Sequence, residues 1–261
     1  MLIKKLKILL ITAFLFSSNI YAQKCNVEKY LFKKGEKVEY TVYYNWGFIW
    51  LKAAKVDFTV SDTIIKNTEI WKFTSTGKTL PGYDWIFSVN DFFQSWVAKD
   101  GFRPLYYYRN TQEGNFRTKN RYIFSQKTNN IYVDLYNSDK GKRKDTLKNE
   151  SCLFDVLSAT YYTRCLNFGT FKKGEKFTVK TIMDGEKAPI LIKYYGKEKI
   201  THKNGKLYNC YHFSTSVVEG NIFKAGQEIH VWVDTKNNNI PVLIKADILV
   251  GSVMVYVDDT Q

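Results

Sequence analysis

The stretch that decides the fold is Lys37-Val-Glu-Tyr-Thr-Val-Tyr-Tyr-Asn-Trp-Gly-Phe-Ile-Trp50. Every even position in it holds an apolar or aromatic residue, whereas Glu39, Thr41 and Asn45 stand at odd positions. This period of two is typical of a β-strand that buries one of its faces. Gly47 interrupts the pattern, which predicts a bend or a bulge at this point.

Similar strand-like segments follow along the rest of the chain, separated by short turns such as Asp100-Gly101 and Asn204-Gly205. Connections this short favour antiparallel meanders over parallel strands joined by crossover helices. After the first segment, the predicted strands are 56–60, 68–76, 93–99, 103–109, 116–125, 130–137, 176–182, 188–200, 206–218, 227–234, 239–249 and 251–258.

One segment, 153–165, has the spacing of a helix. Its apolar residues recur at helical intervals and form one stripe, which consists of Phe154, Leu157, Tyr161 and Cys165. The sequence therefore predicts an all-β, mainly antiparallel protein. Its curved sheets, or an open barrel or sandwich, are expected to wrap this helix.

Polar residues of the same segment suggest how the helix is held. Asp155 in the first turn and Arg164 in the last turn suit the helix dipole. They are nine positions apart, about 13–14 Å along a helix, so they cannot pair with each other. We expect Asp155, Ser158, Tyr161 and Arg164 to form a structural motif that ties the helix to neighbouring strands, and not a catalytic site.

A repeated hexapeptide bears on the domain organisation. Phe-Lys-Lys-Gly-Glu-Lys occurs at 32–37 and again at 171–176, each time before a strand-like run. We expect one β-rich domain over residues 23–261, with two β-units, about 32–137 and 171–258, as a further possibility. The charged segment 138–150, interpreted as a mobile loop, and the helix would join these units. Chance or convergent turn chemistry explains the repeat equally well.

The first 22 residues have the layout of a secretory signal peptide. Lys4, Lys5 and Lys7 precede the apolar run Ile8–Phe16, and a polar shoulder leads to Ala22. The apolar run is too short to span a bilayer as a stable helix. The sequence therefore predicts cleavage near Ala22 and export of the remaining chain to the periplasm as a soluble protein.

The cysteines agree with an exported, oxidised protein. Gln23-Lys24 stands before Cys25, where a lipoprotein signal requires small residues, so we do not expect a lipid anchor. Four cysteines allow two disulfides in three pairings. A straight helix between Cys152 and Cys165 would hold these two cysteines too far apart to bond to each other. The four are Cys25, Cys152, Cys165 and Cys210.

The formal net charge is +14, from 39 basic and 25 acidic residues. A basic surface attracts anions, and an exported protein seldom meets nucleic acid, so an anionic component of the cell envelope is the expected partner. Lysines at turns and strand edges also keep strands soluble without binding anything, which is the simpler explanation.

Several pieces of the chain together resemble one known family. The run Asp155-Val-Leu-Ser-Ala-Thr-Tyr-Tyr-Thr-Arg164 resembles a central element of the exported bacterial family catalogued as domain of unknown function 3108. Other similar segments are 35–40, 45–48, 219–223, 231–234, 240–242 and 250–253. The resemblance implies a Gram-negative envelope protein rich in antiparallel β-structure. It implies no activity, and it supplies no catalytic residues.

The common enzyme motifs are missing from the sequence, which has no HExxH, GxSxG, Walker or GxGxxG pattern. Cys210 and His212 share one face of a predicted strand, and His230 lies on a nearby strand with Glu228 and Asp234. Zinc, copper or a Cys-His nucleophile would suit these residues. We expect a disulfide and ordinary strand histidines in their place, and so no metal or cofactor. The segment 234–239 resembles an incomplete calcium loop, and a hairpin turn is expected there.

The aromatic segment 81–96 is the strongest candidate for a binding site. Its rings, together with two nearby tryptophans, could line an apolar cleft or stack on sugars, although core packing is the alternative. The candidate ligand-binding residues are Trp46, Trp50, Trp85, Phe92, Phe93 and Trp96.

Three functions are compatible with these features. The first is a non-catalytic envelope protein that holds an acyl chain or lipid headgroup in an aromatic-lined concavity, with peripheral contact to a membrane. The second is a secreted hydrolase of glycans or esters, which requires two of Asp84, Asp91 and Glu113 within about 10 Å across a cleft. The third is a scaffold that binds a partner protein along an exposed strand edge.

Overall fold

The computed structural model describes residues 25, 27–46, 48–82, 88–216, 228–248 and 251–258, with the side chains of Trp46 and Ser216 excepted. The predicted signal peptide lies outside the described residues. The first half of the chain contains β1 (Lys37–Trp46), β2 (Ile49–Ile65), β3 (Thr68–Thr79), β4 (Val89–Ala98), β5 (Arg103–Glu113), β6 (Phe116–Ser125), β7 (Asn130–Asn137) and β8 (Gly141–Lys148).

A short strand and the helix separate these strands from the second half. They are β9 (Leu153–Asp155) and α1 (Val156–Arg164), and two 3₁₀ turns lie at Asp100–Phe102 and Phe168–Thr170. The remaining strands are β10 (Lys176–Met183), β11 (Glu186–Lys187), β12 (Ile190–Thr201), β13 (Leu207–Ser216), β14 (Glu228–Asp234), β15 (Pro241–Asp247) and β16 (Ser252–Val257). For the residues that the structure describes, the prediction of a β-protein with one helix is confirmed.

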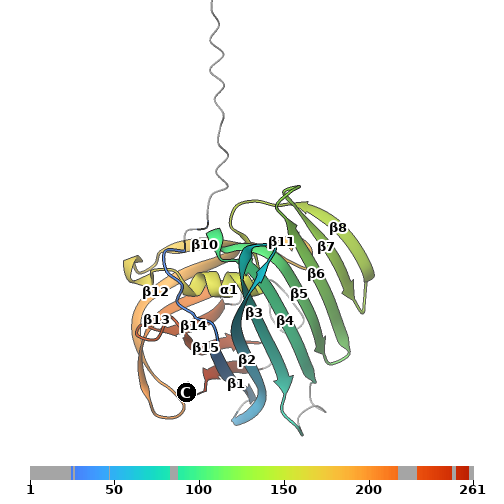
Figure 1. Cartoon of the computed structure of the whole chain (residues 1–261). Coiled ribbons are helices and arrows are strands. Elements are labelled where there is room, and N and C mark those ends of the chain that lie inside the picture. Colours follow the sequence, from blue (N-terminus) through green and yellow to red (C-terminus); the bar gives the residue numbers. More distant parts are fainter. Residues whose placement is uncertain are drawn as a thin grey trace, which may run out of the picture.

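The described strands form one 16-stranded sheet, with β11 and β8 at its two ends. Most neighbours in the sheet are also neighbours along the chain and pair antiparallel, as the short turns predict. The pair β16–β1 differs, because its two strands, the last and the first, lie far apart along the chain. It sets Val257 opposite Tyr40. Figure 1 shows α1 between the β2–β5 part of this sheet and the β12–β14 part.

The two ends of the sheet meet through side chains. The turn between β10 and β11 reaches β5 and β6, where Asp184 Oδ1 lies 3.1 Å from Arg109 Nη1 and accepts from Asn120 Nδ2 at 2.9 Å. The backbone N–H of Gly185 donates to Tyr122 Oη at 3.2 Å. Arg143 Nη2 on β8 donates to the carbonyl of Asp184 in the same turn at 3.2 Å. The sheet therefore curls around α1 until its ends touch, without a backbone ladder between β8 and β11 in the described residues.

The helix begins where Asp155 caps it. Asp155 Oδ1 accepts from the backbone N–H groups of Leu157 and Ser158 at 3.0 and 2.9 Å. Its Oδ2 accepts from the hydroxyls of Ser158 and of Ser95 on β4 at 2.7 and 2.8 Å. Asp155 and Ser158 are fully buried, so this one carboxyl both starts the helix and attaches it to the sheet.

Arg164 fixes the other end of the helix. Its Nη1 lies 2.7 Å from Glu36 Oε1, and both side chains are nearly buried, 7% and 10% exposed. Its Nη2 donates to the carbonyl of Leu31 at 3.0 Å. The free carbonyls after the helix are also satisfied, since Asn239 Nδ2 donates to those of Arg164 and Leu166 at 2.8 and 3.1 Å.

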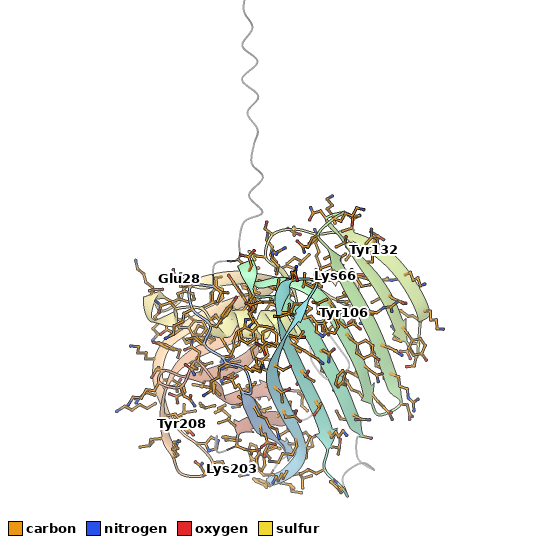
Figure 2. All side chains as sticks on the ribbon, viewed as in Figure 1. Glu28, Lys66, Tyr106, Tyr132, Lys203 and Tyr208 are labelled. Carbon is orange, nitrogen blue, oxygen red and sulfur yellow. A yellow bond between two sulfur atoms is a disulfide. The ribbon has the colours of Figure 1, made fainter. Side chains whose placement is uncertain are left out.

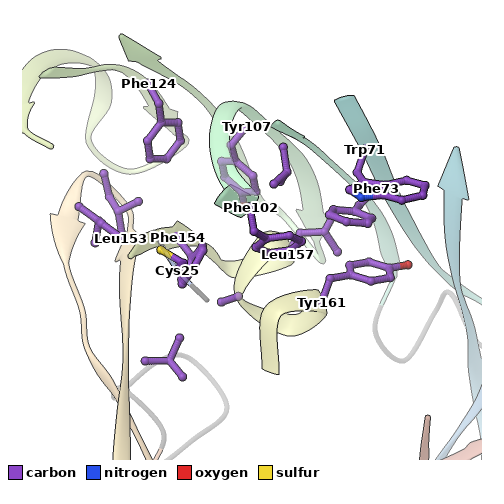
Figure 3. Packing of buried hydrophobic residues seen from close by; sticks show 14 of the residues in the cluster. Cys25, Trp71, Phe73, Phe102, Tyr107, Phe124, Leu153, Phe154, Leu157 and Tyr161 are labelled. Carbon is purple, nitrogen blue, oxygen red and sulfur yellow. The ribbon is translucent and has the colours of Figure 1, made fainter. Parts of the chain in front are cut away.

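Aromatic rings pack between the helix and β3. Tyr161 stacks on Phe73 with 3.9 Å between ring centroids, and Phe32 packs edge-on against both rings. Phe102 lies beside this group, next to Phe154. Figure 3 shows Phe73, Phe102 and Tyr161 between the helix and the strands. The large buried surface of these side chains explains why the core gathers on this side of α1.

The repeated hexapeptide forms the same turn twice. Gly35 and Gly174 have φ of +81° and +86°, a conformation that favours glycine. Each glycine N–H donates to a strand carbonyl, that of Val60 in β2 at 2.9 Å and that of Tyr194 in β12 at 2.8 Å. Both copies therefore have one local structure. The division of the chain into two β-units stays a prediction.

Three predicted boundaries are wrong. The run 38–50 is two strands, because Trp46 pairs with Ile49 and the chain reverses between them. The segment 138–150 is not a loop, since it contains β8, whose charges suit a strand at the edge of a sheet. The helix starts after 153–155, because these residues pair in parallel with β10.

One disulfide, Cys25–Cys152, is present among the described residues, with 5.4 Å between the Cα atoms. Cys165 and Cys210 are free thiols, so the possible second bridge is not formed. Burial raises the pKa of Cys165 to about 11 and that of Cys210 to about 12, which makes both thiols unreactive.

Replacing Arg164 by methionine is expected to lower the free energy of unfolding by about 3–5 kcal/mol, because Glu36 is left buried without its partner. Urea unfolding measures this difference. The matched control is Arg103→Met, whose partner Asp100 is 70% exposed, and it should cost at most about 1 kcal/mol. Equal losses in the two variants would contradict the importance of the buried pair.

Burial raises the pKa of Asp155 to about 6 in the folded protein, above its value of about 3.9 in an unfolded chain. The folded state therefore binds the proton more strongly. The free energy of unfolding should fall by about 2–3 kcal/mol as pH rises from about 4 to above 6.

Asp155→Asn keeps an acceptor oxygen for the helix N–H groups and should reduce this slope. Asp139→Asn, in an exposed turn, should leave it unchanged. The measurement is urea unfolding across the same pH range, and an unchanged slope in Asp155→Asn would refute the assignment.

Candidate functional site

Hollows lie on two sides of α1 inside the curled sheet. One, of about 340 Å³, lies between α1 and the strands β10 and β12–β15. The other, of about 270 Å³, lies between α1 and β2–β4. Val156 and Thr160 line both hollows, so one face of the helix borders the two spaces.

The wall of the larger hollow is aliphatic and aromatic because alternate residues of several strands share one face. Phe213 on β13 stands opposite Val231 on β14, which stands opposite Ile244 on β15. This row of three comes from different strands at one level of the sheet. Further apolar lining comes from Ile190, Ile192 and Ile229.

The smaller hollow has an apolar wall with one acidic group. Val56 and Phe58 of β2 and Phe93 of β4 line it, together with Asp91. Desolvation, and then the nearby charge of Glu113, raise the pKa of Asp91 to about 6. Asp91 Oδ1 accepts from the backbone N–H of Gln112 at 3.2 Å. Asp91 is therefore neutral in mildly acidic solution and charged above pH 6.

The structure separates the aromatic candidates. Phe93 lines the smaller hollow, whereas Phe92 and Trp96 lie on the opposite face of β4, because successive residues of a strand point to opposite sides. Trp50 is 45% exposed on β2. Trp85 and the side chain of Trp46 lie outside the described part of the chain.

The helix motif contributes little to the hollows. Asp155, Ser158 and Tyr161 are buried in the core, and Arg164 borders the larger hollow at the helix end. These residues hold the helix in place, so the apolar lining comes from their neighbours on other faces of α1.

The two strand histidines contact each other on a separate face. His212 Nε2 lies 2.9 Å from His230 Nδ1, and His212 Nδ1 lies 3.1 Å from Glu198 Oε2. Burial lowers the pKa of His212. Cys210 is fully buried two residues away. Within the described ranges, no three His, Cys, Asp or Glu side chains are arranged to hold a metal ion.

The segment 234–239 is a hairpin turn, as predicted. The N–H of Lys236 donates to Asp234 Oδ1 at 3.0 Å, and Asn238 and Asn239 both have φ of +50°. Asn239 uses its amide to cap the helix end, which explains why an asparagine serves here.

The acids required by the hydrolase hypothesis do not face each other. Asp91 stands opposite Thr111 on β5, and Val89 stands opposite Glu113, so the two acids are diagonal neighbours on one face of the sheet. Carboxylates that cleave a glycosidic bond flank it. Asp84 lies outside the described residues.

The lining of the larger hollow is not among the residues predicted from the sequence. In the sequence, these residues cannot be distinguished from ordinary core positions. The alternation of apolar and polar residues shows which face of a strand is buried, but not whether that face packs on the helix or borders a space beside it. A weak signal existed in the helix, where Val156, Thr160 and Thr163 form a second stripe that no large residue fills.

A sequence profile of the family described as "Protein of unknown function (DUF3108)" matches residues 39–258. The chain belongs to this family. The resemblance stated from the sequence is thereby confirmed, and it extends from β1 to the end of β16.

The DUF3108 segments noted in the sequence fall on different parts of the fold. Asp155–Arg164 is the cap and the whole of α1, and 231–234 ends β14. The segment 219–223 lies outside the described residues. No curated protein matches the chain.

Among solved structures, the DUF3108 chain is similar to a β-barrel-like protein of domain of unknown function DUF1849 from Brucella abortus. The TM-score is 0.49 at 9% sequence identity, over 85% of this chain and 94% of the other. In the part of the chain described here, no helix has both the length and the apolar character needed to cross a bilayer.

Proposed function

We propose that this DUF3108 protein is an exported, non-catalytic protein of the periplasm that binds an apolar, lipid-like chain in the hollows beside α1. The observation that carries the proposal is the apolar lining of the larger hollow, to which β12–β15 and the helix all contribute. Small-molecule sites are typically mainly apolar and of about 300–1,000 Å³, which is the range of this hollow.

The position of the hollows supports a pre-formed site. Both border α1, whose two ends are fixed by Asp155 and Arg164 through buried hydrogen bonds. A ligand would therefore meet a wall that does not have to be ordered on binding, which lowers the entropic cost of association.

The few polar groups at the hollows favour an uncharged chain. Threonine and serine hydroxyls line both hollows, and Asp91 is the acidic group that lines the smaller one. Arg164, at the end of the larger hollow, is already paired with Glu36. An anionic headgroup beside ionised Asp91 would be repelled. We therefore expect the apolar part of the ligand to occupy the hollows and any negative group to remain outside them.

The proposed location rests on two features. The first 22 residues have the pattern of a cleaved signal peptide. The disulfide Cys25–Cys152 requires an oxidising compartment such as the periplasm. Expression with and without residues 1–22, followed by fractionation and N-terminal sequencing, tests both the export and the cleavage near Ala22.

Thr160→Trp tests the binding site, because the indole would fill space that both hollows share without entering the core. We expect the affinity for the neutral probe N-phenyl-1-naphthylamine, measured by fluorescence titration, to fall at least about tenfold. Native mass spectrometry should also show less co-purifying lipid.

The control for this variant is Thr63→Trp, which places the same side chain at an exposed position of β2 and should leave binding unchanged. Thermal unfolding of each variant shows whether the fold is kept. If folded Thr160→Trp binds the probe as well as the original protein does, the hollows are not the binding site.

The charge of Asp91 predicts how binding depends on pH. An apolar ligand in the smaller hollow removes water from this carboxyl, which disfavours its charged form. We expect probe affinity to fall about two- to fivefold as pH rises through about 6. Asp91→Asn should remove this dependence, whereas Asp145→Asn on β8 should keep it. Titrations that depend equally on pH in all three proteins would refute the role of Asp91.

A further inference from the structure

The outer face of β5–β8, opposite the core, carries rings and cations in an ordered array. One row across the strands runs from Tyr108 through Arg121 and Asp134 to Lys144, each residue directly opposite the next. The adjacent row runs from Lys119 through Tyr136 to Lys142. Tyrosines and cations therefore lie next to one another both along and across the strands.

This array encloses a shallow hollow of about 640 Å³. Three tyrosines and four cations line it against a single carboxylate, that of Asp134, which is paired with Arg121 at 2.9 Å. The lining is Tyr106, Tyr108, Tyr136, Lys119, Arg121, Lys142 and Lys144, with Asp134. The hollow is thus positively charged and has aromatic walls.

The support behind this face is rigid. Tyr107, Tyr122 and Val133 on the same strands point to the opposite side and are buried in the core. On the outer face, Tyr106 packs on Trp96 with 4.9 Å between ring centroids, and Phe92 lies 6.1 Å from Tyr108. Phe92 and Trp96, expected at the apolar site, in fact extend this outer face. Figure 2 shows Tyr106 and Tyr132 on this part of the sheet.

The composition of the face argues against other occupants. A surface that inserts into a membrane needs contiguous apolar side chains, and here cations separate the rings. A second copy of the same face would bring like charges together. Nucleic acid also suits rings and cations, but the disulfide Cys25–Cys152 indicates a compartment where nucleic acid is scarce.

We propose that the outer face of β5–β8 binds an acidic polysaccharide of the cell envelope. Sugar rings would stack on Tyr106, Tyr108 and Tyr136, and carboxylate or phosphate groups would pair with Lys119, Lys142 and Lys144. This site lies on the opposite side of the sheet from the hollows beside α1, and it does not depend on an apolar ligand there.

Calorimetric titration of the purified protein with polygalacturonate, at low and high salt, tests the proposal. Neutral dextran and polyglutamate serve as the uncharged sugar and the charged polymer without rings. We expect binding to polygalacturonate that weakens with salt, and weaker binding to both comparison polymers.

Two sets of variants separate charge from stacking. Lys119→Gln with Lys144→Gln should weaken polygalacturonate binding about three- to tenfold, whereas Lys176→Gln with Lys199→Gln, on exposed parts of β10 and β12, removes equal charge and should change it less than about twofold. Tyr136→Ser, at a residue 37% exposed, should weaken polygalacturonate binding but not polyglutamate binding.

Four results would overturn the proposal. They are equal affinity for polyglutamate and polygalacturonate, equal losses in the two lysine pairs, tighter binding to single-stranded DNA than to polygalacturonate, and tighter binding to phosphatidylglycerol vesicles than to polygalacturonate. Circular dichroism of each variant, all at surface positions, verifies that it is folded.

Discussion

A helix inside a curled sheet has polar ends that water cannot reach, and the structure depends on how those ends are satisfied. Asp155 accepts from two backbone N–H groups at one end and from Ser95 on β4. Arg164 pairs with Glu36 at the other end, where Asn239 takes up the last carbonyls. Unpaired buried groups would each cost several kcal/mol, so these contacts decide both the position and the direction of the helix.

With its ends fixed, α1 divides the interior into a filled side and an open side. Tyr161 and Leu157 lie in the aromatic core together with Phe73. The rings there are closely packed and have little freedom to move. Val156 and Thr160 face the hollows, whose walls are mainly apolar. The same helix thus gives rigidity on one face and space on the other, and the outer strands β5–β8 carry a separate, polar surface.

Much of this architecture follows from the sequence, and the failures have physical causes. Alternation locates most strands, and helical spacing locates α1, because both depend on local geometry. Residues 141–148 have no apolar face, and they form a strand only because β7 offers an edge to pair with. Phe92 and Phe93 are adjacent on a strand and therefore point to opposite sides of the sheet. The aromatic cluster of the sequence is thus divided between the smaller hollow and the outer face of the sheet. The lining of the larger hollow comes from five strands and the helix, and no local pattern encodes such a meeting.

The pairing of β16 with β1 also constrains the order of assembly. If the chain is exported from its N-terminus, β1 emerges first and pairs with β2, but its other edge stays open until the last strand arrives. Contacts between residues so distant in sequence form slowly, and an unpaired edge invites pairing with other chains in the meantime. Because the first strand lies in the middle of the sheet, the sheet can be completed only after β16 has become available to pair with it.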